Sequence, residues 1–222
     1  MNAEELKNTI NDIVRKIDNN KVCDEVLLVG ATKTRDIDTV QTAFEAGLRI
    51  AGENRVQELL AKYKPIEGLS WHFIGALQTN KVKYIVDKVD MIHSVDRIEL
   101  AKEIDNRCKK INKNMQILVE VNIGGEHSKS GIEPEKLFDF LCQLKSFSYL
   151  TVCGIMTVLP IAATEDFYRQ TNELFLSAQK SFPELPLKWL SMGMSNDYEI
   201  ALRNGANMIR LGTAIFGERR YL

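Results

Sequence analysis

Residues 25–64, EVLLVGATKTRDIDTVQTAFEAGLRIAGENRVQELLAKYK, contain the alternation that decides the fold. Two short apolar runs, at 25–31 and 48–53, each lead into a segment in which apolar residues recur every three or four positions, at 36–47 and 54–64. The runs are typical of buried strands, and the longer segments are typical of amphipathic helices. Strands that alternate with helices in this way predict a parallel sheet.

The same unit recurs along the rest of the chain. After a first helix at about residues 4–19, we count eight apolar runs, each followed by a helical segment. The expected strands are 25–31, 48–53, 71–76, 91–95, 115–123, 149–156, 187–193 and 207–212. The expected helices are 36–47, 54–64, 80–89, 96–111, 135–147, 164–182, 196–205 and 213–217. Eight such units in about 200 residues lie at the lower end of the size of a closed (β/α)8 TIM barrel, while a doubly wound open sheet is the alternative.

Composition is that of an ordinary α/β globular protein, with 45% hydrophobic and 27% charged residues among 222. No linker or break in composition divides the sequence, so we expect residues 1–222 to form one barrel domain with an extra N-terminal helix. The net charge of −1 gives no sign of a nucleic-acid surface. The apolar runs are far shorter than the roughly 20 residues of a membrane span, and residues 1–20 lack the apolar core of a secretory signal. We therefore expect a cytoplasmic protein, with a monomer as the default state.

Cysteine and histidine spacing argues against a metal site or a disulfide framework. The four cysteines lie far apart and form no C-x-x-C pair, and the three histidines show no H-x-x-x-H spacing. We expect free thiols in a reducing compartment. His72 and His93, at equivalent places in successive strands, are interpreted as core residues rather than as acids or bases.

Polar residues at the ends of the expected strands form one candidate site, because the active site of such a barrel lies at the C-terminal ends of its strands. A lysine that ends a strand is usually exposed to water. In a barrel, however, Lys33 would point into a polar bowl shared by the other strand ends. The residues that we place in this bowl include Asn54, Ser195, Arg210, Gly212 and Thr213.

The last two loops, SMGMSND at 191–197 and RLGTAIFG at 210–217, have the chemistry of a phosphate site. Barrels often bind phosphate with the loops after strands seven and eight. Glycines let the backbone approach an anion, and hydroxyl and N–H groups can donate to it. Ser195 has an alternative role as the cap of the helix expected at 196–205.

Phosphate binding opposite a strand-end lysine favours pyridoxal 5'-phosphate (PLP) as the ligand. The aldehyde of PLP condenses with a lysine amine to form a Schiff base. A nearby Arg210 would favour the neutral amine of Lys33. The stretch GATKT at 30–34 lacks the G-x-x-x-x-G-K-[ST] pattern of a nucleotide-binding loop.

An ordered set of motifs between about residues 25 and 217 resembles the pyridoxal phosphate homeostasis protein family. The motifs are KT after the first strand, AGENRVQE, WHFIGALQTNK, VNIGGEHSKSG, GIMTV, SMGMSNDYEIA and IRLGTAIFG. The resemblance implies a barrel like the N-terminal domain of alanine racemase, carrying PLP on a lysine. It also implies a role in binding and distributing PLP within vitamin B6 homeostasis, with apo-PLP-dependent enzymes as possible recipients and no established catalytic reaction.

The resemblance assigns a role to each candidate residue. Lys33 matches the Schiff-base lysine, and Arg210 matches the arginine that faces the pyridine nitrogen. Asn54 matches an asparagine that lines the pocket. The phosphate contacts match Ser195, Gly212 and Thr213.

Whether the protein is an enzyme is argued from what racemisation needs. A racemase uses two acid/base groups on opposite faces of the substrate carbon, and proteins similar to alanine racemase take one of them from a second, β-rich domain. The sequence reaches Leu222 a few residues after the eighth strand, so we expect that domain to be absent. We therefore expect a binding and delivery protein without a reaction of its own.

Two enzymatic alternatives remain open. A slow amino-acid racemase would use Lys33 and a second group, for which Lys129, His72 and Tyr84 are the candidates. A sugar-phosphate enzyme without PLP is the other alternative. Lys129, in the loop at 124–134, is either a second cationic contact that helps to hand over the cofactor or an exposed residue. Met156 is expected to pack at the barrel rim.

Overall fold

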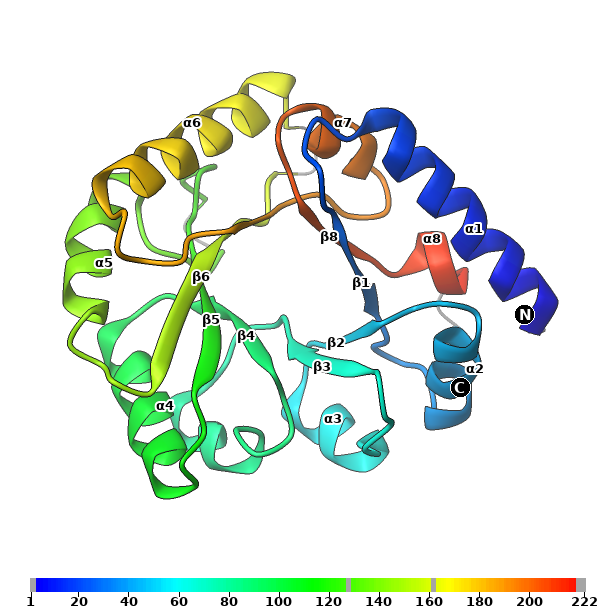
Figure 1. Cartoon of the computed structure of the whole chain (residues 1–222), viewed down its shortest axis with the longest axis horizontal. Coiled ribbons are helices and arrows are strands. Elements are labelled where there is room, and N and C mark those ends of the chain that lie inside the picture. The colour runs from blue at the N-terminus through cyan, green and yellow to red at the C-terminus, as the bar shows by residue number, and fades with distance from the viewer. Residues whose placement is uncertain (1–2, 127–128, 161–162, 219–222) are drawn as a thin grey trace.

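Eight parallel strands form a closed barrel in the order of the chain, within residues 3–126, 129–160 and 163–218, which the computed structural model describes (Figure 1). The pairing of the first strand with the last, Leu27 opposite Met208 through Gly30 opposite Leu211, closes the ring. The expected barrel is confirmed, and the open sheet is wrong. The strands are β1 (Leu27–Ala31), β2 (Ile50–Glu53), β3 (Ser70–Phe73), β4 (Met91–Val95), β5 (Met115–Glu120), β6 (Leu150–Met156), β7 (Trp189–Ser191) and β8 (Met208–Leu211).

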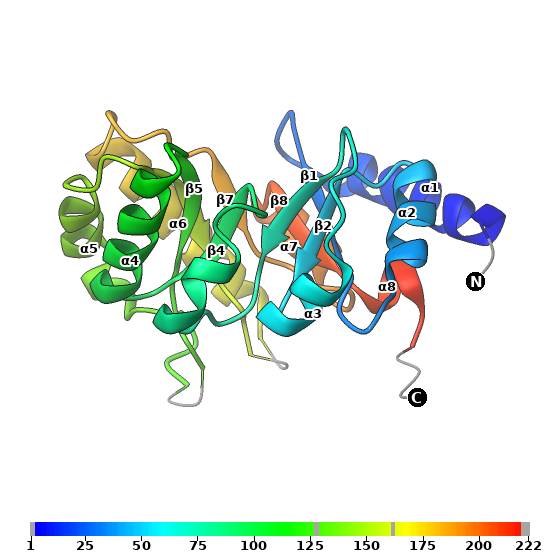
Figure 2. The ribbon, with the colours of Figure 1, turned by 90° about the horizontal axis from the view of Figure 1, so that it is seen from below.

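Helices surround this barrel (Figure 1). They are α1 (Ala3–Asn20), α2 (Ile37–Glu45), α3 (Val56–Lys62), α4 (Ile98–Lys110), α5 (Leu137–Leu144), α6 (Glu165–Ser181), α7 (Tyr198–Arg203) and α8 (Thr213–Phe216), with 3₁₀ helices η1 (Thr79–Tyr84) and η2 (Pro134–Lys136). The amphipathic helix α1 buries Leu6, Ile10, Ile13 and Ile17. It lies beside α2 and α8 on the outside of the barrel (Figure 2).

The regular α-helix expected at 80–89 is wrong. This segment is η1 followed by turns, and several of its N–H groups reach back three residues instead of four, as in the bond from Ile85 N to Val82 O (3.0 Å). The apolar side chains of this segment are still buried in the core, as their spacing predicts: Val82, Ile85, Val86 and Val89. Four β-branched residues in ten have low α-helix propensity, which explains the tighter and less regular backbone.

Apolar residues form two separate clusters on the two sides of the sheet. The larger one lies between the strands and the helices, and the smaller one fills the barrel interior with residues such as Val29, Leu118 and Met208. Successive side chains of a strand point to opposite faces. On β8, Ile209 therefore packs against the helices, while Met208 and Arg210 face the interior. This alternation places a buried guanidinium at the mouth of the barrel.

Candidate functional site

All six residues selected from the sequence line one pocket of about 600 Å³ at the C-terminal end of the barrel. Lys33 follows β1, Asn54 follows β2, and the others come from β8 and from the loops after β7 and β8. The strand ends of a parallel barrel must meet at one face, which explains why residues so far apart in sequence come together. The six are Lys33, Asn54, Ser195, Arg210, Gly212 and Thr213.

Lys33 lies in a tight turn at the end of β1. The N–H of Arg35 donates to the carbonyl of Thr32 (3.0 Å), which makes Lys33 the second residue of a four-residue turn. The third residue, Thr34, has a φ of +64°. Type II turns require a positive φ at this position and favour glycine there. The protein therefore presents its lysine on a strained turn rather than on a freely ending strand.

Arg210 is buried and firmly held. Its Nη1 donates to the carbonyl (2.9 Å) and to Oγ (2.6 Å) of Ser191, and its Nη2 donates to the carbonyl of Thr157 (2.8 Å). Burial lowers the pKa of Arg210 to about 10, while Glu120 and Asp197 act in the opposite direction. The guanidinium stays charged at neutral pH, and Arg210 is among the residues that line the pocket.

Ser195 joins the two loops that the sequence selected for phosphate. Its Oγ accepts from the backbone N–H groups of Gly212 and Ala214, both at 3.1 Å. The alternative role of Ser195 as a cap of the following helix is wrong, because α7 begins at Tyr198 and its N-cap residue is Asp197. The hydroxyl of Ser195 therefore lies where the loop after β8 turns into α8.

Asn54 carries a buried polar atom without a partner. Its Oδ1 finds no hydrogen bond among the residues that the structure describes. The backbone of Gly75 packs closely behind it, since a Cβ at Gly75 would lie 2.3 Å from the carbonyl oxygen of Asn54. A buried acceptor without a donor is costly unless a water or ligand satisfies it. The amide thus marks a place where the pocket is built for a donor.

Sequence reasoning missed the apolar wall and the α6 side of this pocket. Tyr168, on α6, donates from its hydroxyl to Oδ2 of Asp197 (2.7 Å), and burial raises its pKa. Val158 to Pro160 come just after β6, so their place at a strand end could have predicted that they line the pocket. The place of Tyr168 inside a helix gave no such indication. The larger apolar side chains of the lining are Ile74, Val158, Leu159, Pro160, Met194, Ile200 and Phe216.

The two strand histidines lie in the barrel interior, outside the lining of this pocket. Nδ1 of His72 and Nε2 of His93 are 2.9 Å apart and share a hydrogen bond. Burial lowers the pKa of His72 to about 4 and holds that of His93 well below its ordinary value. Both rings are neutral at physiological pH, as expected for core residues.

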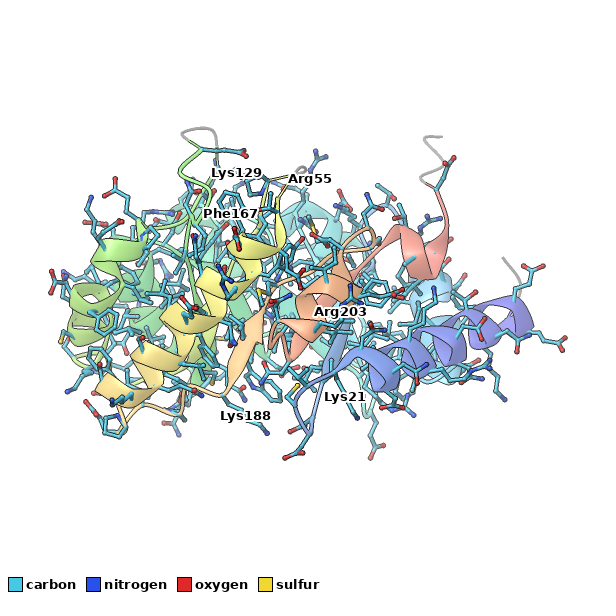
Figure 3. All side chains as sticks on the ribbon, turned by 90° about the horizontal axis from the view of Figure 1, so that it is seen from above. Lys21, Arg55, Lys129, Phe167, Lys188 and Arg203 are labelled. Atoms are coloured by element: carbon cyan, nitrogen blue, oxygen red, sulfur yellow. The ribbon has the colours of Figure 1, made fainter. Side chains whose placement is uncertain are left out.

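Three other residues considered from the sequence, Lys129, Met156 and Tyr84, are not among the described residues that line the pocket. Lys129 forms an ion pair with Glu126 (3.2 Å), and its Nζ donates to the carbonyl of Leu159 (3.0 Å), so it is not merely exposed. Lys129 and Arg55 lie on the same edge of the molecule, opposite Lys21 and Lys188 (Figure 3). Met156 is buried in the barrel interior, and Tyr84 is 42% exposed on η1. His127 lies outside the described residues.

The described part of the chain shows no cluster of three or more His, Cys, Asp or Glu residues suited to a metal ion. Its four cysteines are free thiols. No helix in the same residues is long and apolar enough to cross a membrane.

Comparison with known sequences gives relatives over most of the chain. Residues 2–220 match the family described as the N-terminal domain of alanine racemase. A pyridoxal phosphate homeostasis protein of Aquifex aeolicus (strain VF5) is 45% identical over 203 residues, which cover 87% of each protein. A protein of the same name from Synechocystis sp. is 40% identical over 200 residues, which cover 87% of this chain and 92% of that protein.

Solved structures agree with this relationship. PipY of Synechococcus elongatus PCC7942 without PLP has a TM-score of 0.87 at 30% identity, covering 96% of this chain and 100% of that one. The PipY structure with PLP bound has a TM-score of 0.85 at the same identity and coverage. Alanine racemase of Clostridium difficile 630, at 15% identity and a TM-score of 0.73, covers 94% of this chain and 56% of that one and shows the fold alone. The chain therefore belongs to the pyridoxal phosphate homeostasis protein family.

Proposed function

We propose that this protein binds PLP at the barrel mouth, holds it as a Schiff base on Lys33, and serves PLP homeostasis and delivery without a catalytic reaction of its own. The observation that carries the proposal is the single pocket that collects a lysine, a buried arginine and the two loops joined by Ser195. The PLP-bound structure of PipY and the names of the relatives support it. The proposal includes a single-domain monomer in the cytoplasm, with apo-PLP-dependent enzymes as recipients.

The residues present fit the chemical groups of PLP. The pocket of about 600 Å³ lies in the usual range for a small-molecule site. Ser195 and Thr213 offer hydroxyl groups to a phosphate, Gly212 lines the same wall with its N–H bonded to Ser195, and the buried Oδ1 of Asn54 offers an acceptor. The neutral amine of Lys33 can condense with the aldehyde, forming the C=N bond of the Schiff base and releasing one water molecule.

The proposal of a role without catalysis rests on two features of the site. Arg210 stays charged at neutral pH and can only donate hydrogen bonds. A pyridine nitrogen that accepts from Arg210 must itself be unprotonated, and an unprotonated ring is a weak electron sink. The three side chains considered as a second acid or base are not among the described residues that line the pocket: Lys129, His72 and Tyr84. The weak electron sink disfavours the racemase alternative, and the candidates named from the sequence do not supply its second group; the two acid/base side chains other than Lys33 that do line the pocket, Tyr168 and Asp197, are bonded to each other.

An absorption spectrum of the purified protein, before and after borohydride reduction, tests the proposal. We expect added PLP to give a visible Schiff-base band that reduction removes, and mass spectrometry of peptides to find the reduced cofactor on Lys33. Lys33→Ala should lose both signals, because no other lysine is among the described residues that line the pocket. Lys188→Ala, which changes a lysine on the opposite edge of the molecule, is the control and should keep them (Figure 3). Absence of a band in the unaltered protein would refute PLP binding on this lysine.

Delivery is tested by replacing Lys129. Its ammonium donates to the carbonyl of Leu159, a residue that lines the pocket, and pairs with Glu126, so Lys129 places a cation next to the pocket wall. We expect Lys129→Ala to slow transfer of PLP to an apo-enzyme by roughly 3- to 10-fold, as for one cation at a binding-site mouth. Lys129→Arg keeps the charge and should transfer at nearly the original rate. Equal rates for the alanine variant and the unaltered protein would remove Lys129 from delivery.

A further inference from the structure

A buried ion pair lies on the helix side of the sheet, behind the turn that carries Lys33. Nζ of Lys62 and Oε1 of Glu53 are 3.0 Å apart, and the two side chains are 8% and 0% exposed. Neither residue lines the pocket. Replacing a buried ion pair by apolar residues is often neutral or stabilising, so the presence of this pair calls for a reason other than stability.

Both members of the pair bind Thr32, the residue before Lys33. Nζ of Lys62 donates to the carbonyl of Thr32 (2.8 Å), and the hydroxyl of Thr32 donates to Oε1 of Glu53. The carbonyl of Thr32 also accepts the N–H of Arg35 that closes the turn. The ion pair therefore fixes the first residue of this turn through its backbone and its side chain.

A second carboxylate binds the residue after Lys33. The backbone N–H of Thr34 donates to Oε2 of Glu58 (2.9 Å). Thr34 has the φ of +64° that β-branched residues rarely adopt, so its conformation must be imposed by its surroundings. The hydrogen bond that Thr34 donates to Glu58 is a contact that imposes this conformation.

All three anchoring side chains come from one short stretch of the chain. Glu53 ends β2, while Glu58 and Lys62 lie on α3, the helix that follows. Lys33 lies between the two residues that this stretch holds. A lysine has four flexible side-chain carbons, so a fixed backbone limits where its amine can reach.

We propose that Glu53, Glu58 and Lys62 form a clamp that positions Lys33 for covalent capture of an aldehyde ligand, without contacting the ligand themselves. The inference rests on the proposed function, since it assigns positioning residues to the same lysine. A clamp of this kind acts on the condensation of amine and aldehyde. It leaves the contacts to phosphate and ring to other residues.

Two ligands separate these effects. PLP has the aldehyde, whereas pyridoxine 5'-phosphate has an alcohol in its place and cannot condense with the amine of Lys33. We expect Glu58→Ala to raise the Kd for PLP by about 10-fold, as a misplaced reactive group would. The Kd for pyridoxine 5'-phosphate should change less than about 2-fold, because Glu58 is not in the pocket lining.

Two further variants make the test specific. Glu58→Gln keeps an oxygen that accepts the N–H of Thr34, and it should restore most of the PLP affinity and of the Lys33 product trapped by borohydride. Glu103→Ala is the matched control. Glu103 is also a helical glutamate, 26% exposed like Glu58 and paired with an arginine, but it lies on α4. The Glu103→Ala protein should bind both ligands as tightly as the unaltered protein does.

Each remaining outcome decides the question. The clamp is wrong if Glu58→Ala binds PLP as tightly as the unaltered protein, or if both ligands weaken equally. It is also wrong if Glu58→Gln is as impaired as Glu58→Ala, because the charge rather than the hydrogen bond would then matter. If the unaltered protein binds pyridoxine 5'-phosphate and PLP without trapping on Lys33, the proposed Schiff base fails, and the clamp loses its role with it.

Discussion

Lys62→Met is expected to lower the free energy of unfolding by about 3–5 kcal/mol at pH 8, as for other broken buried ion pairs. The methionine would fit a similar volume, so the loss comes from charge rather than from packing. The carboxylate of Glu53 is fully buried, and one of its oxygens already has no partner among the described residues. Burial raises the pKa of Glu53, while Lys62 and Thr32 act in the opposite direction. Without Lys62, a buried negative charge would lose its main compensation.

The size of this loss should depend on pH. The pKa of Glu53 in the folded variant would lie further above its value in the unfolded chain, so the variant is most stable where Glu53 is protonated and loses stability as pH rises. Urea unfolding at pH 5 and pH 8 should therefore show the larger loss at pH 8. The double variant Glu53→Gln, Lys62→Met also removes the negative charge, and it should recover most of the free energy of unfolding that Lys62→Met loses.

A matched surface pair controls for the loss of a lysine as such. Lys145 and Glu184 form an ion pair at 2.6 Å, but their side chains are 45% and 48% exposed. Lys145→Met should change the free energy of unfolding by less than about 1 kcal/mol. A Lys62→Met protein as stable as the unaltered one at pH 8 would show that the buried pair contributes no more than this surface pair.

The barrel and its pocket could be predicted because both follow from one regular pattern. Repeated strand and helix segments imply a parallel sheet, and a closed parallel sheet brings every strand end to one face. Lys33 and Arg210 are far apart in sequence, yet this rule alone places them together at the mouth. The predicted helix at α8 and the loops around Ser195 follow from the same count of strands.

The groups behind the pocket could not be predicted in this way. Lys62 lies in the last turn of α3, where a cation usually complements the helix dipole in water, so its spacing gave no sign of burial. Glu53 and Asn54 are adjacent at a strand end, so their side chains point to opposite sides, but only the structure shows which of the two faces the pocket. The positive φ at position 34 could not be predicted either, because the residue there is a threonine and not the glycine that usually indicates such a turn.

Glu120 is the second residue whose substitution should have a large effect. It lies on β5, faces the barrel interior and is 7% exposed, and its Oε2 has no partner among the described residues. Burial raises its pKa to about 7, the nearby Asp96 adds to this, and Arg210 acts in the opposite direction. The carboxyl of Glu120 is therefore partly protonated at neutral pH, beneath the pocket that holds Arg210.

The sign of the pH effect follows from the raised pKa. The folded protein holds the proton of Glu120 more tightly than the unfolded chain does, so this contribution to stability is complete below about pH 4.5 and is lost as pH rises through about 7. The interval between these two values corresponds to roughly 3 kcal/mol. Glu120→Gln, which mimics the protonated carboxyl, should remove the dependence.

Urea unfolding of both proteins at several pH values between 4.5 and 8.5 measures this effect. Other titrating groups act equally in the two proteins, so the difference between their free energies of unfolding isolates Glu120. We expect that difference to shift by roughly 3 kcal/mol in favour of Glu120→Gln across this range. Parallel curves for Glu120→Gln and the unaltered protein would mean that the pKa of Glu120 is the same in the folded and unfolded protein, so that the charge of Arg210 compensates for its burial.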